Sequence, residues 1–196
     1  MKNKWMLVII VLLIAALACG SGGSTSEITN STLKKVCRGE GVEEAAVYGS
    51  AGDGTGPYPV VAFRRASEDD AWFLIGPDDM GEGFPPEWRS SQGTQTELVL
   101  CLTTIERELV QECAYTAQDD QEGGEIQLMV ELYNTTYDVV LRNARTAEQY
   151  DTTTIEAATT GVCEQYALEV IDQDTRIIDA PPGASLIPFL EPWVEE

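Results

Sequence analysis

The most regular alternation of hydrophobic and polar positions in the chain lies between Ile126 and Leu141. Its apolar side chains fall first at even and then at odd positions: Ile126, Leu128, Val130 and Leu132, followed by Tyr137, Val139 and Leu141. Because successive side chains of a strand point to opposite faces, both runs predict half-buried β-structure. The change of parity predicts a bulge in one long strand or a tight hairpin near residues 134–136.

A second β pattern spans Glu97–Thr116 and contains two cysteines. The charged triplet Glu106-Arg107-Glu108 in its middle predicts a turn between two antiparallel strands. In that register Cys101 lies opposite Cys113, and both sulfur atoms share one face because side chains alternate along each strand.

Shorter segments fill the rest of the predicted domain. They are a helix at Thr32–Arg38, a hairpin of Val60–Phe63 with Ala71–Ile75, an irregular lid at Gly76–Gln92, a turn at Asn143–Ala147, a returning strand at Glu148–Ile155 and a final helix at Ser185–Val194. Ala167–Ile178 fits either a strand or a helix. The pattern predicts a mainly β fold, an antiparallel sheet or sandwich with one or two short helices, and the alternative is an α+β fold.

The first residues predict an export signal. Lys2 and Lys4 precede an apolar run of fourteen residues, Trp5–Ala18. This run is shorter than the ~20 residues that a membrane-spanning helix needs. The run ends in Ala16-Leu17-Ala18-Cys19, which resembles the lipobox of bacterial lipoproteins. The resemblance implies cleavage after Ala18, a diacylglyceryl group on the Cys19 sulfur and a fatty acyl group such as palmitate on the new amino terminus. The alternative is an ordinary secretory signal.

Three regions follow from this reading. Residues 1–18 form the signal peptide, and residues 19–31, rich in Gly, Ser and Thr, form the lipidated cysteine and a flexible tether. Residues 32–196 then form a single extracytoplasmic β-rich domain, a size that suits one hydrophobic core.

The chain is strongly acidic, with 12 Lys and Arg against 33 Asp and Glu and a formal net charge of −21. Removal of residues 1–18 takes away two lysines and leaves 10 basic against 33 acidic residues, or −23. Such a charge repels phosphate backbones and anionic lipid head groups. We therefore expect no nucleic-acid partner, and expect the acyl chains on Cys19 to supply the membrane contact. Acidity most simply serves solubility, and the alternative is attraction of a cationic partner or divalent ions.

Four cysteines follow Cys19, and an even number in an exported chain predicts disulfides. They are Cys37, Cys101, Cys113 and Cys163. The chain has no histidine and no Cys-x-x-Cys pair, so neither a zinc site nor a redox motif is expected. The hairpin register favours Cys101–Cys113 with Cys37–Cys163. Directly opposed strand cysteines tend to be strained, so pairing of each with a distant cysteine stays open.

The sequence carries no recognisable catalytic constellation. Without histidine, a serine or cysteine nucleophile lacks its usual base. Among 33 carboxylates an acid pair suited to glycoside hydrolysis arises by chance. The acidic clusters at Glu68–Asp70, Asp78–Asp79 and Asp119–Asp120 lack the spacing of a calcium loop. We expect no enzymatic activity, no metal and no cofactor.

Aromatic side chains are the remaining candidates for recognition. Trp72, Phe84 and Trp88 lie in or beside the predicted lid. Trp and other aromatic residues are enriched at protein and carbohydrate contacts, so these three predict a possible binding face for an unknown protein or carbohydrate partner. The alternative is that they pack in the core.

Several pieces of sequence, taken in order, carry a resemblance to a known group. They are Cys37–Val42, Ala45–Tyr48, Pro59–Val61, Pro85–Trp88, Leu98–Cys101, Glu112–Tyr115, Leu141–Thr146, Cys163 and Trp193. Over Cys37–Trp193 the chain resembles uncharacterised exported or lipid-anchored bacterial domains of Chloroflexi type. The group usually has Gly at the position of Ala147 and Cys-Pro at Cys163-Glu164. The resemblance implies a β-rich scaffold with two disulfides and no functional site.

These patterns together predict a lipid-anchored domain in the cell envelope, on the extracytoplasmic side of a bacterial membrane. The expected role is binding or structural, without catalysis. One alternative is an accessory subunit of an envelope transporter or assembly that uses an exposed aromatic patch. The other is an acid-pair hydrolase, which would need two carboxylates facing each other in a cleft.

Overall fold

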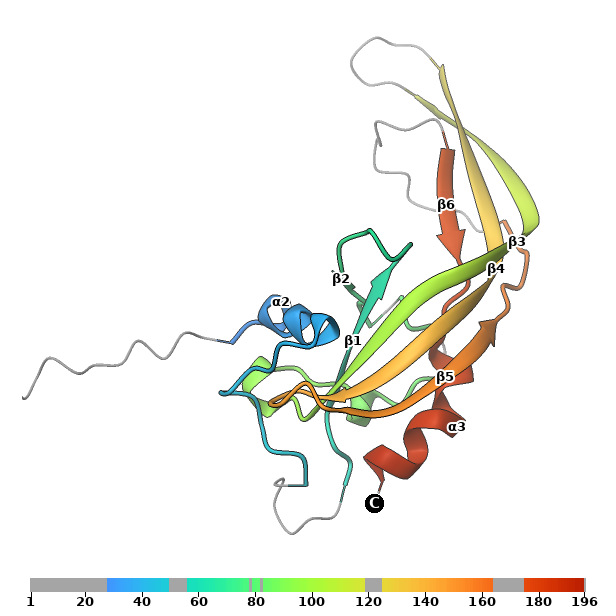
Figure 1. The fold of residues 1–196 in the computed structure, drawn as a ribbon. Helices are drawn as coiled ribbons and strands as arrows, with labels where there is room; N and C mark the ends of the chain where they lie inside the picture. The colour runs from blue at the N-terminus through green and yellow to red at the C-terminus, as the bar shows by residue number, and fades with distance from the viewer. Residues whose placement is uncertain are drawn as a thin grey trace, which may run out of the picture.

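The computed structural model describes residues 28–49, 56–77, 79–81, 83–118, 125–163 and 175–195. They form one curved β-sheet with short helices against it (Figure 1). The mainly β class expected from the sequence is confirmed. The sheet is mixed, because two of its strand pairs are parallel: β1 (Val60–Arg65) with β3 (Leu98–Gln118), and β6 (Thr175–Asp179) with β4 (Glu125–Asn143).

The sheet runs in the order β2-β1-β3-β4-β5, and β6 pairs with β4 next to the stretch that β5 occupies. The strands are β1 (Val60–Arg65), β2 (Phe73–Leu74), β3 (Leu98–Gln118), β4 (Glu125–Asn143), β5 (Gln149–Ala157) and β6 (Thr175–Asp179). The helical segments are α2 (Asn30–Leu33), η1 (Lys34–Arg38), η2 (Pro86–Trp88), η3 (Gly93–Gln95) and α3 (Gly183–Val194).

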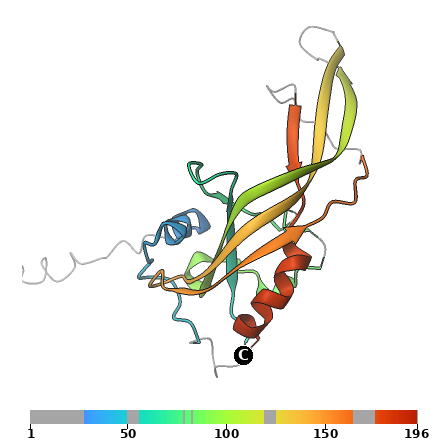
Figure 2. The same cartoon turned by 45° about the vertical axis from the view of Figure 1, so that its right-hand side comes forward.

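One long hairpin of β3 and β4 organises the molecule. Its first half lies between β1 and β5, and its second half extends beyond them and bends away (Figures 1 and 2). We call this second half, residues 106–118 with 125–133, the arm. β6 covers the edge of β4 there, while β1 reaches only as far as Thr103 along β3.

The predicted turn at Glu106-Arg107-Glu108 is wrong, because β3 continues through this triplet as one strand of 21 residues. Two β-bulges accommodate it, one between Thr104 and Glu106 and one between Leu109 and Gln111. A bulge adds a residue and increases the local twist, which is consistent with the bend at this point. The charge of Arg107 is matched by Asp179, 72 residues later, so it does not mark a solvated loop.

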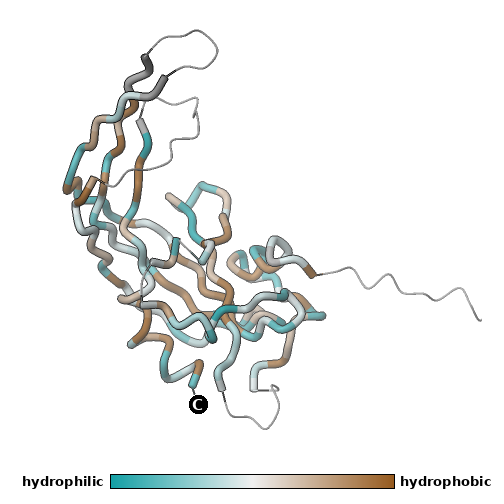
Figure 3. The backbone as a smooth tube through the Cα atoms, turned by 180° about the vertical axis from the view of Figure 1, so that it is seen from behind, coloured by the Kyte–Doolittle hydropathy of each residue, from teal (hydrophilic) through white to brown (hydrophobic). Residues whose placement is uncertain are grey.

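The change of parity along Ile126–Leu141 has a different cause from the bulge or hairpin expected. β4 is one continuous strand, and the bulges opposite it lie in β3. Val130 and Leu132 point to the opposite face from Tyr137 and Val139, and all four are buried. Each half of β4 therefore buries a different face, the even side in the arm and the odd side near α3. Figure 3 shows hydrophobic and hydrophilic positions interleaved along the arm.

Helices cover both faces of the broad half of the sheet (Figure 2). Leu186, Leu190 and Val194 of α3 recur every four residues and pack on the face that carries Val139. On the opposite face, Leu33 and Val36 of the short N-terminal helices pack with Val61, Phe63 and Val99. Because both faces are covered, Leu98–Leu102 is fully buried and forms the centre of the domain.

Several local predictions are confirmed. β1 and β2 pair as an antiparallel hairpin, β5 returns along β4, and a helix closes the chain at Gly183–Val194. The turn at Asn143–Ala147 is held by the Asn143 side chain, whose Oδ1 accepts hydrogen bonds from the amides of residues 145 and 146. Of the ambiguous stretch Ala167–Ile178, residues 175–178 lie in β6 and the rest is outside the described residues.

The N-terminal boundary of the packed domain lies before the expected residue 32. Ile28 is buried against the backbone of Gly93, where a Cβ atom would collide with the Ile28 carbonyl. The predicted signal peptide, Cys19 and the tether up to residue 27 lie outside the described residues. Among the described helices, none is long and apolar enough to cross a membrane.

Candidate functional site

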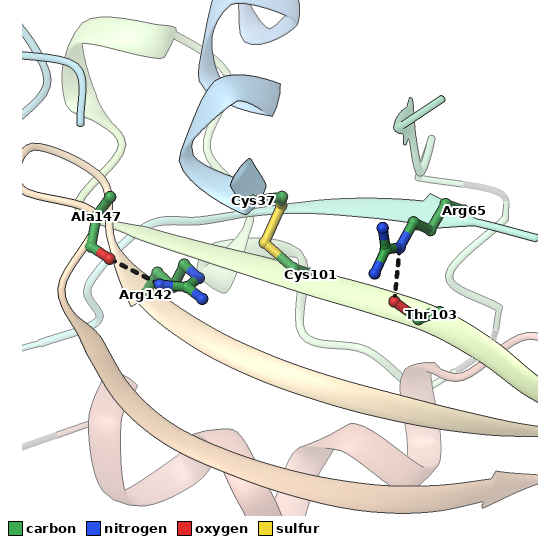
Figure 4. Close-up of a disulfide and its surroundings, with 6 residues drawn as sticks. All are labelled: Cys37, Arg65, Cys101, Thr103, Arg142 and Ala147. Atoms are coloured by element: carbon green, nitrogen blue, oxygen red, sulfur yellow. Dashed lines mark hydrogen bonds between the residues drawn. A yellow bond between two sulfur atoms is a disulfide. The ribbon is translucent and has the colours of Figure 1, made fainter. Parts of the chain in front are cut away.

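The first disulfide joins Cys37 of η1 to Cys101 of β3 (Figure 4). It fastens the N-terminal helices to the buried centre of the sheet, where Cys101 is only 3% exposed. On one side of it Arg65 donates from Nε to Thr103 Oγ1 at 2.9 Å, and on the other Arg142 donates to the Ala147 carbonyl at 2.9 Å. These bonds tie neighbouring strands and the turn together around the disulfide.

The second disulfide joins Cys113, in the arm, to Cys163, which follows β5. The weakly favoured pairing of Cys101 with Cys113 is therefore wrong. Both lie in β3, and at ~3.3 Å per residue their positions are about 40 Å apart, far beyond the reach of a disulfide. Each cysteine pairs with a distant one, the arrangement that the sequence left open. Two disulfides indicate an oxidising, extracytoplasmic environment.

The three aromatic residues named as a possible binding face do not share a surface. Trp88 and Phe84 are 2% and 5% exposed and pack edge to face, with ring centroids 5.8 Å apart, in the core beneath α3. Trp72 lies with the core cluster on the other face, half-buried, and the Arg65 guanidinium carbon sits 4.6 Å from its ring centre. Phe84 and Trp88 therefore lie in the core, which is the alternative that the sequence left open.

A cluster of charges at the base of the arm was not found from the sequence. Asp179 accepts two hydrogen bonds from Arg107, at 2.6 and 3.0 Å, and its side chain is 6% exposed. Arg64 approaches the same carboxylate at 3.6 Å, and Thr135 Oγ1 lies 3.3 Å from it. The hydrogen bond to Asp179 raises the pKa of Arg107 above its ordinary value. The cluster holds β1, β3, β4 and β6 together, and we call it the charged lock.

Tyr137 packs beside this lock and donates its hydroxyl hydrogen to the Ala180 carbonyl at 2.9 Å. Burial, and then the charge of Asp179, raise the pKa of the Tyr137 phenol. A neutral phenol at this position keeps its hydrogen bond and places no second negative charge near Asp179.

A pocket of about 250 Å³ opens beside the outer edge of β1. Its walls are mainly apolar, and its polar side chains come from the three residues that follow η2. The full lining consists of Val60, Val61, Ala62, Leu74, Ile75, Gly76, Pro77, Met80, Phe84, Arg89, Ser90 and Ser91. Two hydrogen bonds frame the pocket along β1, from the Ile75 amide to the Ala62 carbonyl and from the Ser90 amide to the Val60 carbonyl. The predicted lid, Gly76–Gln92, therefore forms most of one side of a cavity.

Arg89 is the one charged residue in this lining. Its Nη2 donates to the Phe84 carbonyl at 3.3 Å, and its guanidinium carbon lies 5.5 Å from the Phe84 ring centre. Its Nε is shielded from solvent and has no hydrogen-bond partner. Sequence patterns pointed to the neighbouring Trp88 instead, because no local pattern distinguishes Arg89 from a surface arginine.

Ligands for a metal ion do not converge in the described part of the chain: no three His, Cys, Asp or Glu side chains come together there. Of the acidic clusters weighed for calcium, Asp78 and Asp119–Asp120 lie outside the described residues, whereas Glu68–Asp70 is exposed.

Comparison with protein-family models, curated proteins and solved structures finds no match to this chain. The disulfides, the charged lock and the pocket are therefore interpreted from their own geometry.

Proposed function

We propose that the protein is a non-catalytic binding or structural domain that a lipid on Cys19 anchors to the extracytoplasmic side of a bacterial membrane. The observation that supports this proposal most strongly is the pair of disulfides. Each ties β3 to a segment 50 or 64 residues away in sequence. Such crosslinks persist in oxidising compartments, in agreement with the export signal at the start of the chain.

The short connection to Cys19 fits an anchored domain. Ile28, the first described residue, is already buried, and eight residues, Gly20–Glu27, separate it from the lipidated cysteine. Fully extended, eight residues span at most about 28 Å. The domain would therefore stay close to the membrane, and its net charge of about −23 would keep it off anionic head groups.

The absence of catalysis is supported by the chemistry of the described pocket. Its lining contains one guanidinium and two serine residues but no carboxylate, and the chain has no histidine to activate a serine. The most buried carboxylate of the charged lock, Asp179, is already engaged by Arg107 and Arg64. Binding is a better use of these groups than proton transfer.

The anchor is tested by fractionating cells that express the full chain or its Cys19→Ser variant, with a clickable fatty acid in the medium. We expect the unmodified chain in the membrane fraction with label, and Cys19→Ser without label and outside that fraction. Ser21→Ala, two residues away, is the matched control and should behave as the unmodified chain. Membrane-bound, labelled Cys19→Ser would contradict the anchor.

A second candidate role, as an accessory subunit of an envelope assembly, is favoured by exposed apolar side chains on the arm and on β6 beside it. Leu109 pairs with Tyr133 and Ile177 with Glu131, so all four point to one face. Leu109 and Ile177 are 46% and 53% exposed. If this face contacts a partner, the double variant Leu109→Glu with Ile177→Glu should no longer co-purify with an envelope protein that the unmodified chain retains. The control variant, Asp138→Lys at an exposed site of β4, should still co-purify with that protein.

A further inference from the structure

The pocket beside β1 is large enough for a small organic molecule. A buried apolar cavity of ~150 Å³ can hold benzene, so about 250 Å³ accommodates one ring with a short chain or an aliphatic chain of similar volume. Its walls of Val, Ala, Leu, Ile, Met and Phe side chains exclude strongly polar ligands. Mostly apolar walls with a few placed polar groups are typical of small-molecule sites.

The guanidinium of Arg89 makes few hydrogen bonds within the described part of the protein. A guanidinium carries five N–H donors, and burial of a charged donor without an acceptor is unfavourable. Arg89 Nε has no acceptor, and its Nη2 bond to the Phe84 carbonyl is long at 3.3 Å. Within the described residues, the ion pairs use Arg64 and Arg107, and no carboxylate pairs with Arg89. Among the residues that the structure describes, no carboxylate therefore neutralises the guanidinium in this pocket.

We propose that this pocket binds a small monocarboxylic acid, with its apolar body between β1 and Phe84 and its carboxylate on Arg89. Guanidinium and carboxylate match in geometry and charge, so the acid would accept hydrogen bonds from the Arg89 guanidinium where it lines the pocket. The ligand is monovalent because the rest of the chain is strongly negative and the pocket offers a single cation. The proposal deepens the binding role proposed above and rests on it.

The ligand class is tested with 3-phenylpropionate and its uncharged amide, 3-phenylpropanamide, which have nearly the same shape. Each is titrated calorimetrically into the full chain held in lipid nanodiscs, with empty nanodiscs as the blank. We expect one molecule of acid per chain and affinity about tenfold or more above that of the amide, because only the acid forms charge-assisted hydrogen bonds. No binding of the acid at millimolar concentration, or equal affinity for both probes, overturns the proposal.

The contact with Arg89 is tested with Arg89→Gln, which keeps a donor and removes the charge. We expect it to reduce the acid's affinity about tenfold and to leave that of the amide nearly unchanged. Arg145→Gln, on the exposed turn between β4 and β5, is the matched control and should bind the acid as the unmodified chain does. An Arg89→Gln chain that is folded by circular dichroism and binds the acid normally contradicts the assignment.

These outcomes stay separate from those of the anchor experiment. If Arg89→Gln does not fold, the acid–amide comparison on the unmodified chain still decides the ligand class. If no acid binds but Cys19→Ser leaves the membrane, the pocket assignment fails and the anchor proposal stands.

Discussion

Asp179 connects four strands at the base of the arm. It is the last residue of β6, yet it contacts side chains from β1, β3 and β4. Removal of one partner of a buried ion pair leaves the remaining charges without compensation. Arg107 and Arg64 are 28% and 39% exposed, so water recovers part of that loss.

We predict that Asp179→Asn lowers the free energy of unfolding by about 2 kcal/mol. Urea titration followed by far-UV circular dichroism measures the change. Asp138→Asn, at an exposed position of β4, is the control and should change stability by less than about 0.5 kcal/mol. Equal stability of the two variants would show that the charged lock contributes nothing measurable.

We expect Tyr137 to make the fold sensitive to alkaline pH. Its folded-state pKa lies above the ordinary value of about 10 because it is buried next to Asp179. The neutral phenol therefore stabilises the fold fully below pH ~10, and this stabilisation is lost as the pH rises through the folded-state pKa.

We predict that Tyr137→Phe is about 1 kcal/mol less stable at neutral pH, because the hydrogen bond to the Ala180 carbonyl is lost. Above pH ~10 its stability should fall less steeply than that of the unmodified chain, so the two curves converge. Urea midpoints measured from pH 7 to pH 11 provide the comparison. Parallel curves would exclude Tyr137 as the source of the alkaline sensitivity.

At the scale of elements, the two disulfides hold different parts of the long hairpin. Cys37–Cys101 lies where the sheet is covered on both faces. Cys113–Cys163 lies in the arm, whose separate small core consists of Cys113, Leu128, Val130 and Leu132. A core this small stabilises little by itself, so the crosslink is the main constraint on the arm.

We predict that the double variant Cys113→Ala with Cys163→Ala loosens the arm selectively. Chain entropy assigns a loop of this length about 4 kcal/mol, most of which should appear as local opening. In hydrogen exchange, amides of residues 128–132 should exchange much faster, and those of residues 98–102 should keep their protection. The control, Cys37→Ala with Cys101→Ala, should instead weaken the protection of residues 98–102. Uniform acceleration in the first variant would contradict a separately stabilised arm.

Sequence patterns predicted the elements whose contacts are local. Asn143 signals its turn through its own side-chain bonds, and the spacing of Leu186, Leu190 and Val194 signals α3. The turn expected at Arg107 failed because its counter-ion, Asp179, is distant in sequence. The switch of apolar side chains from even to odd positions along β4 could not be interpreted either. It depends on which segments cover each face of the sheet, and these segments are distant in sequence.

The same limit applies to the candidate site. Nothing next to Arg89 in sequence shows that its Nε is buried and unpaired, because the pocket requires β1 and the segment after β2 together. Ala147 is a converse case: the resemblance pointed to Gly there, and the residue adopts φ +59°, a left-handed conformation that Gly adopts most readily.

As a whole, the described part of the chain is a β domain crosslinked by two disulfides, which we propose is held at a membrane by the residues before it. The helices pack on the broad half of the sheet, and the arm extends away from it (Figure 1). Its strong negative charge favours solubility and repels anionic lipid surfaces, so the acyl group would supply the attachment. Export, lipidation and oxidation are therefore expected together on one molecule.

Intact and peptide mass spectrometry of the unreduced protein, isolated from the envelope of a producing bacterium, tests this most directly. We predict a chain that begins at an acylated Cys19 and has no free thiol. Peptides containing Cys37 and Cys101, and those containing Cys113 and Cys163, should be linked in pairs. An unprocessed chain that still carries residues 1–18 and whose four later cysteines are reduced would contradict it.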